Sequence, residues 1–219
     1  MKISRYGITL ELLTAQHTEM VRHWRNDKKI AKHMFYKGEI TTAMQQEWFT
    51  SVNNEQNYFF LIQYNGNYVG LINMSSIDWE SQTAYSGLFI YDDAYLGTDI
   101  PVSASLAMLD VFFLLLNIQT VFAKVKGDNA VAHQYNTMLG FSQTKKIELG
   151  LGHEYLLNKE VYLLKAKKLR NAAIRLKGNQ TKIEIMQEGS RDKFINNKLQ
   201  RMRTETFATL GVELLPQTR

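Results

Sequence analysis

The pattern of apolar and polar positions in the first fifty residues predicts one strand followed by two helices. Residues 3–13 alternate weakly between apolar and polar positions, which predicts a strand. Residues 19–26 carry apolar side chains on one side at helical spacing. Thr41 and Thr42 precede a second apolar group and predict a capped, short helix that contains Trp48 and Phe49.

Residues 58–91 predict three strands in succession. Two apolar, aromatic runs at 58–64 and 68–77 are separated by Asn65-Gly66, and this pair is a strong signal for a hairpin because both turn positions favour positive φ. Residues 83–91 predict a third strand. Gly87 inside it indicates a bulge or the close approach of another backbone.

The stretch that follows alternates helices and strands. Residues 101–116 are apolar nearly all round and predict a helix buried on most sides, with Pro101 in its first turn. A strand is expected at 119–126 and a helix from Gly127-Asp128 to about residue 138. Further strands are expected at 141–147 and 161–166. Residues 1–166 therefore predict one domain of the α/β class, with mixed layers of helices and sheet.

Residues 167–219 differ from this domain in charge. They hold 12 Lys and Arg against 5 Asp and Glu, whereas the first 166 residues hold 14 against 16, so the net charge of +5 arises in the tail. Helices are expected at 167–177 and 191–210, the second with an apolar stripe of Phe194, Ile195, Leu199, Met202 and Phe207. We expect this basic, helical extension to pack on the domain or on a second subunit as a homodimer, rather than to bind nucleic acid.

Composition removes several classes of function. The chain has no cysteine, which excludes disulfides and thiolate chemistry, and its five histidines show no metal-ligand spacing, so no metal is expected. The most apolar run, 102–116, is shorter than the roughly 20 residues of a membrane span. The first residues lack the apolar stretch of a signal peptide. We expect a soluble, cytoplasmic protein with no membrane partner.

Residues 84–141 carry the most specific pattern. A strand with Gly87 leads through a turn into the apolar helix, and the next strand leads to Asn129-x-x-Ala132 and then to Leu139-Gly140-Phe141. This order and spacing resembles the acyl-CoA-binding core of the GNAT acetyltransferase superfamily. The resemblance implies a mixed, mainly antiparallel sheet flanked by helices, with acetyl-CoA as co-substrate.

The resemblance assigns the cofactor's pyrophosphate to the loop before the apolar helix, at Leu96, Gly97, Thr98, Asp99 and Ile100. Backbone amides and the positive end of the helix dipole bind anions at such a place. The family pattern has a basic or amide residue where Leu96 stands and a glycine where Asp99 stands. The Asp99 carboxylate could cap the helix and repel a phosphate, so both a binding and a non-binding loop remain open.

The resemblance also implies roles nearer the reacting atoms. Backbone amides near Phe89 and Ile90 would polarise the thioester carbonyl, and Asn129 would bond near the pantetheine arm or simply cap its helix. Many members have a tyrosine seven residues after that asparagine, and it protonates the departing thiolate as a general acid. In this chain Asn136 occupies that position.

Two tyrosines near these positions, Tyr135 and Tyr85, have different expected roles. Tyr135 lies about 100° away from the Asn136 face, which favours a packing role. Tyr85 stands where the family often has glutamate and could relay a proton through water, or it is an ordinary strand aromatic.

On the acceptor side, Trp24-Arg25-Asn26 and Trp48-Phe49 resemble a branch of the family. That branch includes ribosomal-protein N-terminal acetyltransferases and enzymes acting on nucleotide-linked amino sugars. Trp24 and Arg25 are the candidate acceptor-binding residues, although Arg25 could instead bond the loop after its own helix. The function that follows is N-acetylation of a small amine, such as a nucleotide-linked amino sugar. The alternative is a binding or scaffold protein that keeps the fold without catalysis.

Overall fold

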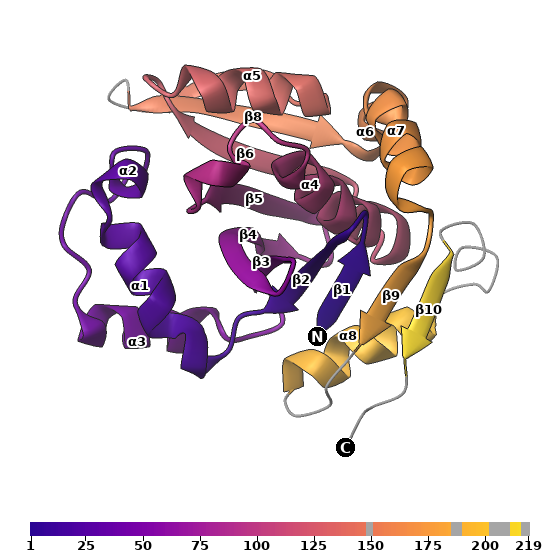
Figure 1. Ribbon diagram of the computed structural model, residues 1–219, viewed down its shortest axis with the longest axis horizontal. Coiled ribbons are helices and arrows are strands. Elements are labelled where there is room, and N and C mark those ends of the chain that lie inside the picture. Colours follow the sequence, from indigo (N-terminus) through magenta and orange to yellow (C-terminus); the bar gives the residue numbers. More distant parts are fainter. Residues whose placement is uncertain (148–150, 185–189, 202–210, 216–219) are drawn as a thin grey trace.

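The computed structural model describes residues 1–147, 151–184, 190–201 and 211–215, and it is built on one mixed sheet (Figure 1). The order of the described strands across the sheet is β10-β9-β1-β2-β3-β4-β5-β6-β8-β7. In chain order the strands are β1 (Lys2–Arg5), β2 (Ile8–Leu12), β3 (Tyr58–Tyr64), β4 (Asn67–Asp78), β5 (Thr83–Ile90), β6 (Thr120–Lys126), β7 (Ser142–Ile147), β8 (Gly152–Asn158), β9 (Thr181–Glu184) and β10 (Val212–Leu215). Two neighbouring pairs, β5 with β6 and β9 with β10, are parallel, and the other pairs are antiparallel. The mainly antiparallel fold class is confirmed.

Helices cover both faces of this sheet (Figure 1). The helices are α1 (Thr18–Asn26), α2 (Lys28–Ala31), α3 (Thr42–Val52), α4 (Ile100–Asp110), α5 (Ala130–Leu139), α6 (Lys159–Lys165), α7 (Lys167–Lys177) and α8 (Ser190–Gln200). The larger apolar core lies between the sheet and α4, which continues as a wider helical turn over Val111–Leu115. A smaller core on the opposite face joins α1 to Leu61 of β3 and Leu71 of β4. We call this second side of the sheet the α1 face.

Most of the expected elements are present, and the first strand is the earliest difference. Residues 3–13 form a hairpin rather than one strand, because Tyr6 and Gly7 turn the chain with φ of 54° and 76°. The Asn65-Gly66 turn between β3 and β4 is confirmed, with φ of 48° and 81°. Thr41 caps α3 as expected, since its hydroxyl accepts a hydrogen bond from the amide of Met44.

The prediction of a strand at 161–166 is wrong. Residues 161–165 belong to α6, and the strand that pairs with β6 on the side away from β5 is β8, which the sequence pattern does not indicate. A short apolar run such as Val161-Tyr162-Leu163-Leu164 fits a buried helix as well as a strand, so its periodicity alone does not decide between them.

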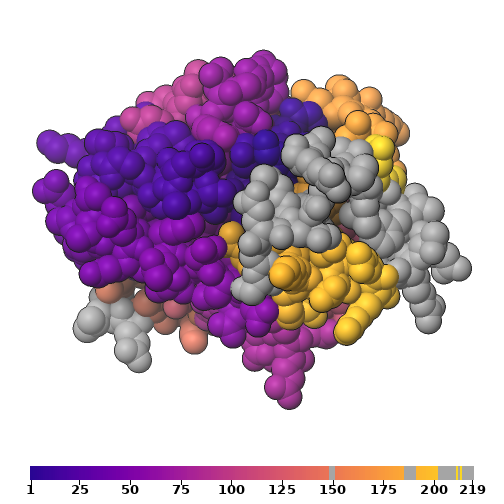
Figure 2. Space-filling model, turned by 90° about the horizontal axis from the view of Figure 1, so that it is seen from below, coloured from indigo at the N-terminus to yellow at the C-terminus, as the bar shows by residue number. Residues whose placement is uncertain are grey.

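The C-terminal extension is part of the same sheet. Helix α7 forms where expected, and β9 pairs with β1 while β10 pairs with β9, although the sequence analysis predicts no strand there. Ile195 and Leu199 of α8 are buried in the larger core, and Phe194 packs on Trp79 with ring centroids 5.3 Å apart. Figure 2 shows this yellow segment lying against the body of the molecule. The packing of the tail on the domain is confirmed for α7 and α8, whereas Met202 and Phe207 lie outside the described residues.

A buried carboxylate joins the extension to the domain. Asp110, at the end of α4, is 1% exposed and accepts hydrogen bonds from Tyr6 Oη at 2.6 Å and Tyr162 Oη at 2.7 Å. Arg5 of β1 and Arg170 of α7 pair with it at 3.0 and 2.8 Å. Burial and this carboxylate together raise the pKa of both tyrosines, which keeps them as hydrogen-bond donors. We call this group the Asp110 network.

Candidate active site

The most distinctive feature of the sheet is the gap that opens between β5 and β6. The two strands pair from Thr83 with Thr120 to Ser86 with Ala123, and beyond that point β5 remains paired with β4 while β6 remains paired with β8. One edge of β5 from Gly87 to Ile90 therefore has no strand beside it among the described residues. Backbone groups along such an edge can bind an extended ligand.

The direction of the β5 amides can be worked out from one hydrogen bond. The amide of Tyr91 donates to Val69 O of β4 at 2.8 Å. Because amide direction alternates along a strand, the amide of Phe89 also points to β4, while those of Leu88 and Ile90 point into the gap. Of the two residues expected to polarise a thioester, Ile90 is oriented for it and Phe89 is directed at its partner strand.

Gly87 makes room for a polar side chain rather than for a bulge. A Cβ built on Gly87 would lie 2.8 Å from Asn73 Oδ1, and the irregular register of these strands falls farther along, between Ser75 and Asp78. Asn73 donates from Nδ2 to Ser75 Oγ at 2.9 Å. A polar patch thus faces Gly87 on the α1 face of the sheet, at the base of the gap.

Tyr85 lies on this same face, where the parallel pairing ends. Its hydroxyl donates to Glu154 Oε2 of β8 at 3.1 Å, and Lys124 Nζ lies 4.9 Å from its ring centroid. Its ring packs on Phe122 of β6 at 5.3 Å. Burial raises the pKa of Tyr85, and the neighbouring Glu154 raises it further, so the hydroxyl is protonated at neutral pH. This geometry is compatible with the proton relay expected of Tyr85.

The loop before α4 keeps free donors at the helix N-terminus. Gly97 has φ of 78° with open space around it, and Leu96 is 55% exposed. Thr98 Oγ1 accepts from the amide of Ile100 at 3.2 Å. Within the described part of the chain, the amides of Gly97 and Asp99 donate no hydrogen bond. Two unsatisfied amides at the positive end of an eleven-residue helix fit an anionic group such as a pyrophosphate.

The expectation that the Asp99 carboxylate caps α4 is wrong. Asp99 occupies the N-cap position, but its side chain makes no capping hydrogen bond. It points instead to the end of α7, where Lys177 Nζ lies 3.5 Å from Asp99 Oδ2. A cation from the C-terminal extension thus partly neutralises the carboxylate that stands in the loop.

Helix α5 begins and ends as its sequence predicts. Asn129 is the N-cap, with Oδ1 accepting from the amide of Ala132 at 3.1 Å, and Gly140 ends the helix with φ of 103°. Asn136 donates from Nδ2 to Ala132 O at 2.8 Å, a bond within its own helix. The capping role of Asn129 is observed, and the roles of both asparagines toward ligands stay predictions.

Tyr135 joins α5 to α4. Its hydroxyl donates to Pro101 O at 2.7 Å and lies 2.7 Å from Ser105 Oγ. Burial raises its pKa. These contacts give Tyr135 a packing role between two helices, in agreement with its position off the Asn136 face.

The two candidate acceptor residues on α1 have different surroundings. Trp24 is 6% exposed and stacks on Tyr91 at 5.1 Å, so it belongs to the smaller core. Arg25 lies over the ring of Trp48 at 5.3 Å and reaches Gln45 Oε1 of α3 at 3.5 Å. Burial lowers its pKa.

The loop after α1 and α2 is hydrogen-bonded to Asn26 and not to Arg25 among the described residues. Asn26 donates to Ile40 O at 2.8 Å and accepts from the amide of Ile40 at 2.9 Å. The Arg25 guanidinium thus does not have the role of a structural hydrogen-bond donor to that loop.

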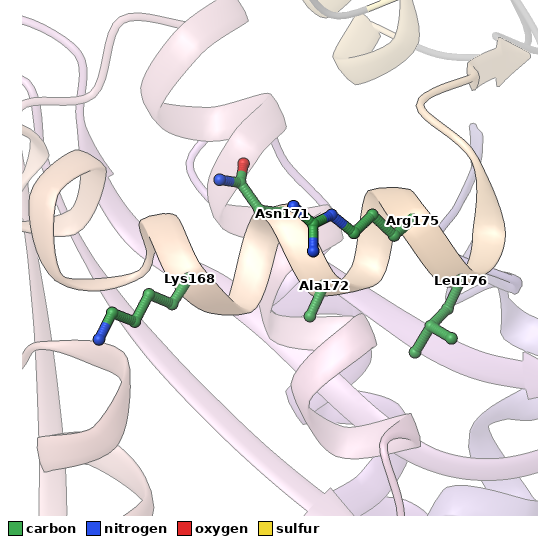
Figure 3. A pocket seen from close by; sticks show the side chains of 5 residues that line it. All are labelled: Lys168, Asn171, Ala172, Arg175 and Leu176. Atoms are coloured by element: carbon green, nitrogen blue, oxygen red, sulfur yellow. The ribbon is translucent and has the colours of Figure 1, made fainter.

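Two hollows on the described surface lie away from the gap. One of about 310 Å³ lies between the β1–β2 and β3–β4 turns and reaches Lys177. One of about 510 Å³ runs along α7, lined by Lys168, Asn171, Ala172, Arg175 and Leu176 (Figure 3). The second hollow is lined by residues of α7 alone, and none of the candidate site residues around the gap lines it.

Two further features bear on the expected class of protein. Over the described ranges, no group of three or more His, Asp or Glu is arranged to hold a metal ion. No helix in the same ranges is long and apolar enough to cross a membrane.

Comparison with known families agrees with this geometry. Residues 8–142, more than half of the chain, match the family described as the acetyltransferase (GNAT) domain. The chain belongs to this family, whose members use acetyl-CoA, so the resemblance to the GNAT superfamily and the co-substrate expected from it are confirmed. The resemblance to the branch of ribosomal-protein and amino-sugar acetyltransferases stays a prediction. A comparison with curated proteins gives no match.

Solved structures share the fold at low sequence identity. A domain from Methanocaldococcus jannaschii is 20% identical with a TM-score of 0.61, and the match covers 69% of this chain and 97% of that one. Spermidine N-acetyltransferase from Vibrio cholerae, in complex with CoA and spermine, is 17% identical with a TM-score of 0.63, covering 72% and 98%. A structure described as a putative acetyltransferase is 16% identical with a TM-score of 0.61, covering 78% and 96%. These likenesses establish the fold.

The residues that the sequence analysis missed come from strands and from the tail. Asn73 and Ser75 are polar positions within an apolar strand and share a face with Gly87, which is a signal the sequence does contain. Glu154 lies on a strand that was not predicted, and Lys177 is distant in sequence from Asp99.

Proposed function

We propose that this protein transfers the acetyl group of acetyl-CoA to the amino group of a small molecule. The observation that carries the proposal is the gap between β5 and β6, with free amides on one side and Tyr85 at its base. The amides of Gly97 and Asp99 would hold the pyrophosphate. The amides of Leu88 and Ile90 would hold the pantetheine arm and the thioester oxygen.

For the acceptor, we propose an amine that also carries negative charge, such as a nucleotide-linked amino sugar. Arg25 and Lys124 both lie on the α1 face of the sheet, beside Trp48 and Tyr85. Cations at an acceptor site attract phosphates or carboxylates and repel a polycation. This charge pattern favours a nucleotide-linked amine over the polyamine that the Vibrio cholerae enzyme binds.

The proposal is tested first by cofactor binding. Acetyl-CoA should raise the melting temperature in a concentration-dependent way, because it binds the folded chain alone. Gly97→Ala should weaken this binding, since it strains the loop at φ 78°. Gly66→Ala provides a matched control at φ 81°, in equally open space but in a hairpin turn. Equal weakening by both variants, or no binding to the unmodified protein, would contradict the proposed cofactor site.

Turnover is tested next, with thiol release measured for a panel of amines. A nucleotide-linked amino sugar should be acetylated with a higher kcat/KM than spermidine. The opposite order would contradict the proposed acceptor class but not the acetyl transfer.

A second candidate function is that of a binding or scaffold protein with this fold. Leu96 and Asp99, which replace the family's cofactor-binding residue types, favour it. Acetyl-CoA binding without turnover of any amine would support this second function. Homodimer formation through the C-terminal extension stays a prediction for either function, and sedimentation of the full chain measures it.

A further inference from the structure

Glu154 is a buried carboxylate for which the proposed function has so far no role. It is 6% exposed and lies on β8, opposite Lys124 of β6. Its side chain faces the base of the gap, where Oε2 accepts the hydrogen bond of Tyr85 at 3.1 Å. Burying a carboxylate is costly unless it is paired, and the partners of Glu154 are the Tyr85 hydroxyl and Lys145 of β7.

Two lysines and a tyrosine lie around Glu154. Lys145 of β7 lies 3.4 Å from Oε1, with its own side chain 69% exposed. Lys124 of β6 lies over the Tyr85 ring. The hydroxyl of Tyr85 donates to Oε2, and Tyr85 lies on the same face of β5 as Gly87 and the polar patch beside it.

We infer that Glu154 is the proton acceptor of the acetyl transfer and acts through the hydroxyl of Tyr85. This inference rests on the proposed function. An amine reaches a protein at neutral pH mainly as its ammonium form, which has no lone pair for attack on a thioester. Tyr85 would take a proton from the ammonium while passing its own proton to Glu154, so that the tyrosine ends neutral as it began.

The remaining protons then balance. The neutral amine forms the new N–C bond, and the C–S bond breaks with its electron pair leaving on sulfur. The second proton of the nitrogen goes to the thiolate, directly or through water. Glu154 releases its proton to solvent after the products leave. The net result is one amide, one thiol and one proton for each ammonium ion consumed.

The test is the pH profile of kcat/KM for Glu154→Gln, measured with an acceptor amine that the unmodified protein turns over. Glutamine can still accept the Tyr85 hydrogen bond but cannot take a proton. For the unmodified protein, which has the relay, kcat/KM should stay level around neutral pH. For Glu154→Gln, kcat/KM should be ~10²-fold lower than that of the unmodified protein at pH 7 and should rise about tenfold per pH unit up to the pKa of the amine.

Two comparisons separate this role from a structural one. Tyr85→Phe should give the same profile as Glu154→Gln, and the double variant should lose no more than either alone. Glu160→Gln, at an exposed position on α6, serves as the control and should match the unmodified protein. Acetyl-CoA binding should stay within about twofold in all of them.

If Glu154→Gln lowers kcat/KM by the same factor at every pH, the inference is wrong. It is also wrong if the losses of kcat/KM from Glu154→Gln and Tyr85→Phe add up in the double variant. Neither outcome affects the acetyl-CoA titration of the unmodified protein, whose failure would instead contradict the proposed function itself.

Discussion

Replacing Asp99 by asparagine should strengthen acetyl-CoA binding, because the substitution removes a negative charge beside the amides that would hold the pyrophosphate. The Asp99 side chain is 54% exposed and that of Lys177 is 30% exposed, so their attraction at 3.5 Å is that of a surface pair. In water, such a pair gains about 1 kcal/mol at most. Lys177 therefore offsets the carboxylate only in part.

The size of the effect follows from Coulomb's law. If the carboxylate stands about 6 Å from a bound phosphate, each unit of phosphate charge is repelled by about 0.7 kcal/mol at the dielectric constant of water. Two such charges give about 1.4 kcal/mol, a factor of about ten in Kd, before screening by salt and by Lys177. We expect Asp99→Asn to lower the Kd for acetyl-CoA three- to tenfold at low ionic strength.

Isothermal titration calorimetry at two salt concentrations measures this prediction. The gain should shrink as salt rises from about 20 mM to about 0.5 M, because the interaction is between exposed charges. Lys177→Gln should raise the Kd by a similar factor. Asp93→Asn, which removes an exposed carboxylate paired with Lys29 at 3.4 Å, is the control. An unchanged Kd for Asp99→Asn at low salt would show that the pyrophosphate does not bind at this loop.

Three further predictions concern the framework of the site. Tyr135→Phe loses the hydrogen bond to Pro101 O, so the free energy of unfolding measured by chemical denaturation should fall by about 1 kcal/mol. Its kcat/KM should stay within a few-fold of that of the unmodified protein. A ~10²-fold lower kcat/KM would instead make Tyr135 the general acid. Asp110→Ala removes the carboxylate shared by two arginines and should lower the free energy of unfolding by about 3–5 kcal/mol, and an effect below about 1 kcal/mol would refute the importance of the Asp110 network. Truncation after Ala166 removes β9 and the buried Ile195, so the melting temperature should fall; an unchanged value would contradict the packing of the extension.

The elements that local chemistry specifies could be predicted from the sequence. The Asn65-Gly66 turn, the Thr41 cap and the Gly140 helix end each depend on a few adjacent residues, and all three form as expected. The parts that depend on distant partners could not be predicted. The strand β9 contains only four residues and is defined by its pairing with β1, which no local pattern shows.

The same distinction applies to the candidate site. The position of Tyr85 follows from its strand, and the resemblance to a family located it. Its partner Glu154 arrives from another strand, and the side-chain direction of Asp99 is decided by Lys177 on a distant helix. Pairings across the sheet and from the tail determine what these residues contact.

The pairing of β1 with β9 has a consequence for how the chain folds during synthesis. Lys2 lies opposite Glu184, so β1, which is synthesised before the other described strands, joins the sheet edge next to β9, which is synthesised after all of them except β10. Contacts between such distant residues slow folding, because a long loop must close before they form. Until residues 181–184 emerge, the outer edge of β1 stays open to other chains, and this exposed edge is a route to aggregation. A ribosome stalled before that point should therefore hold a nascent chain that binds chaperones, and the finished chain should release them.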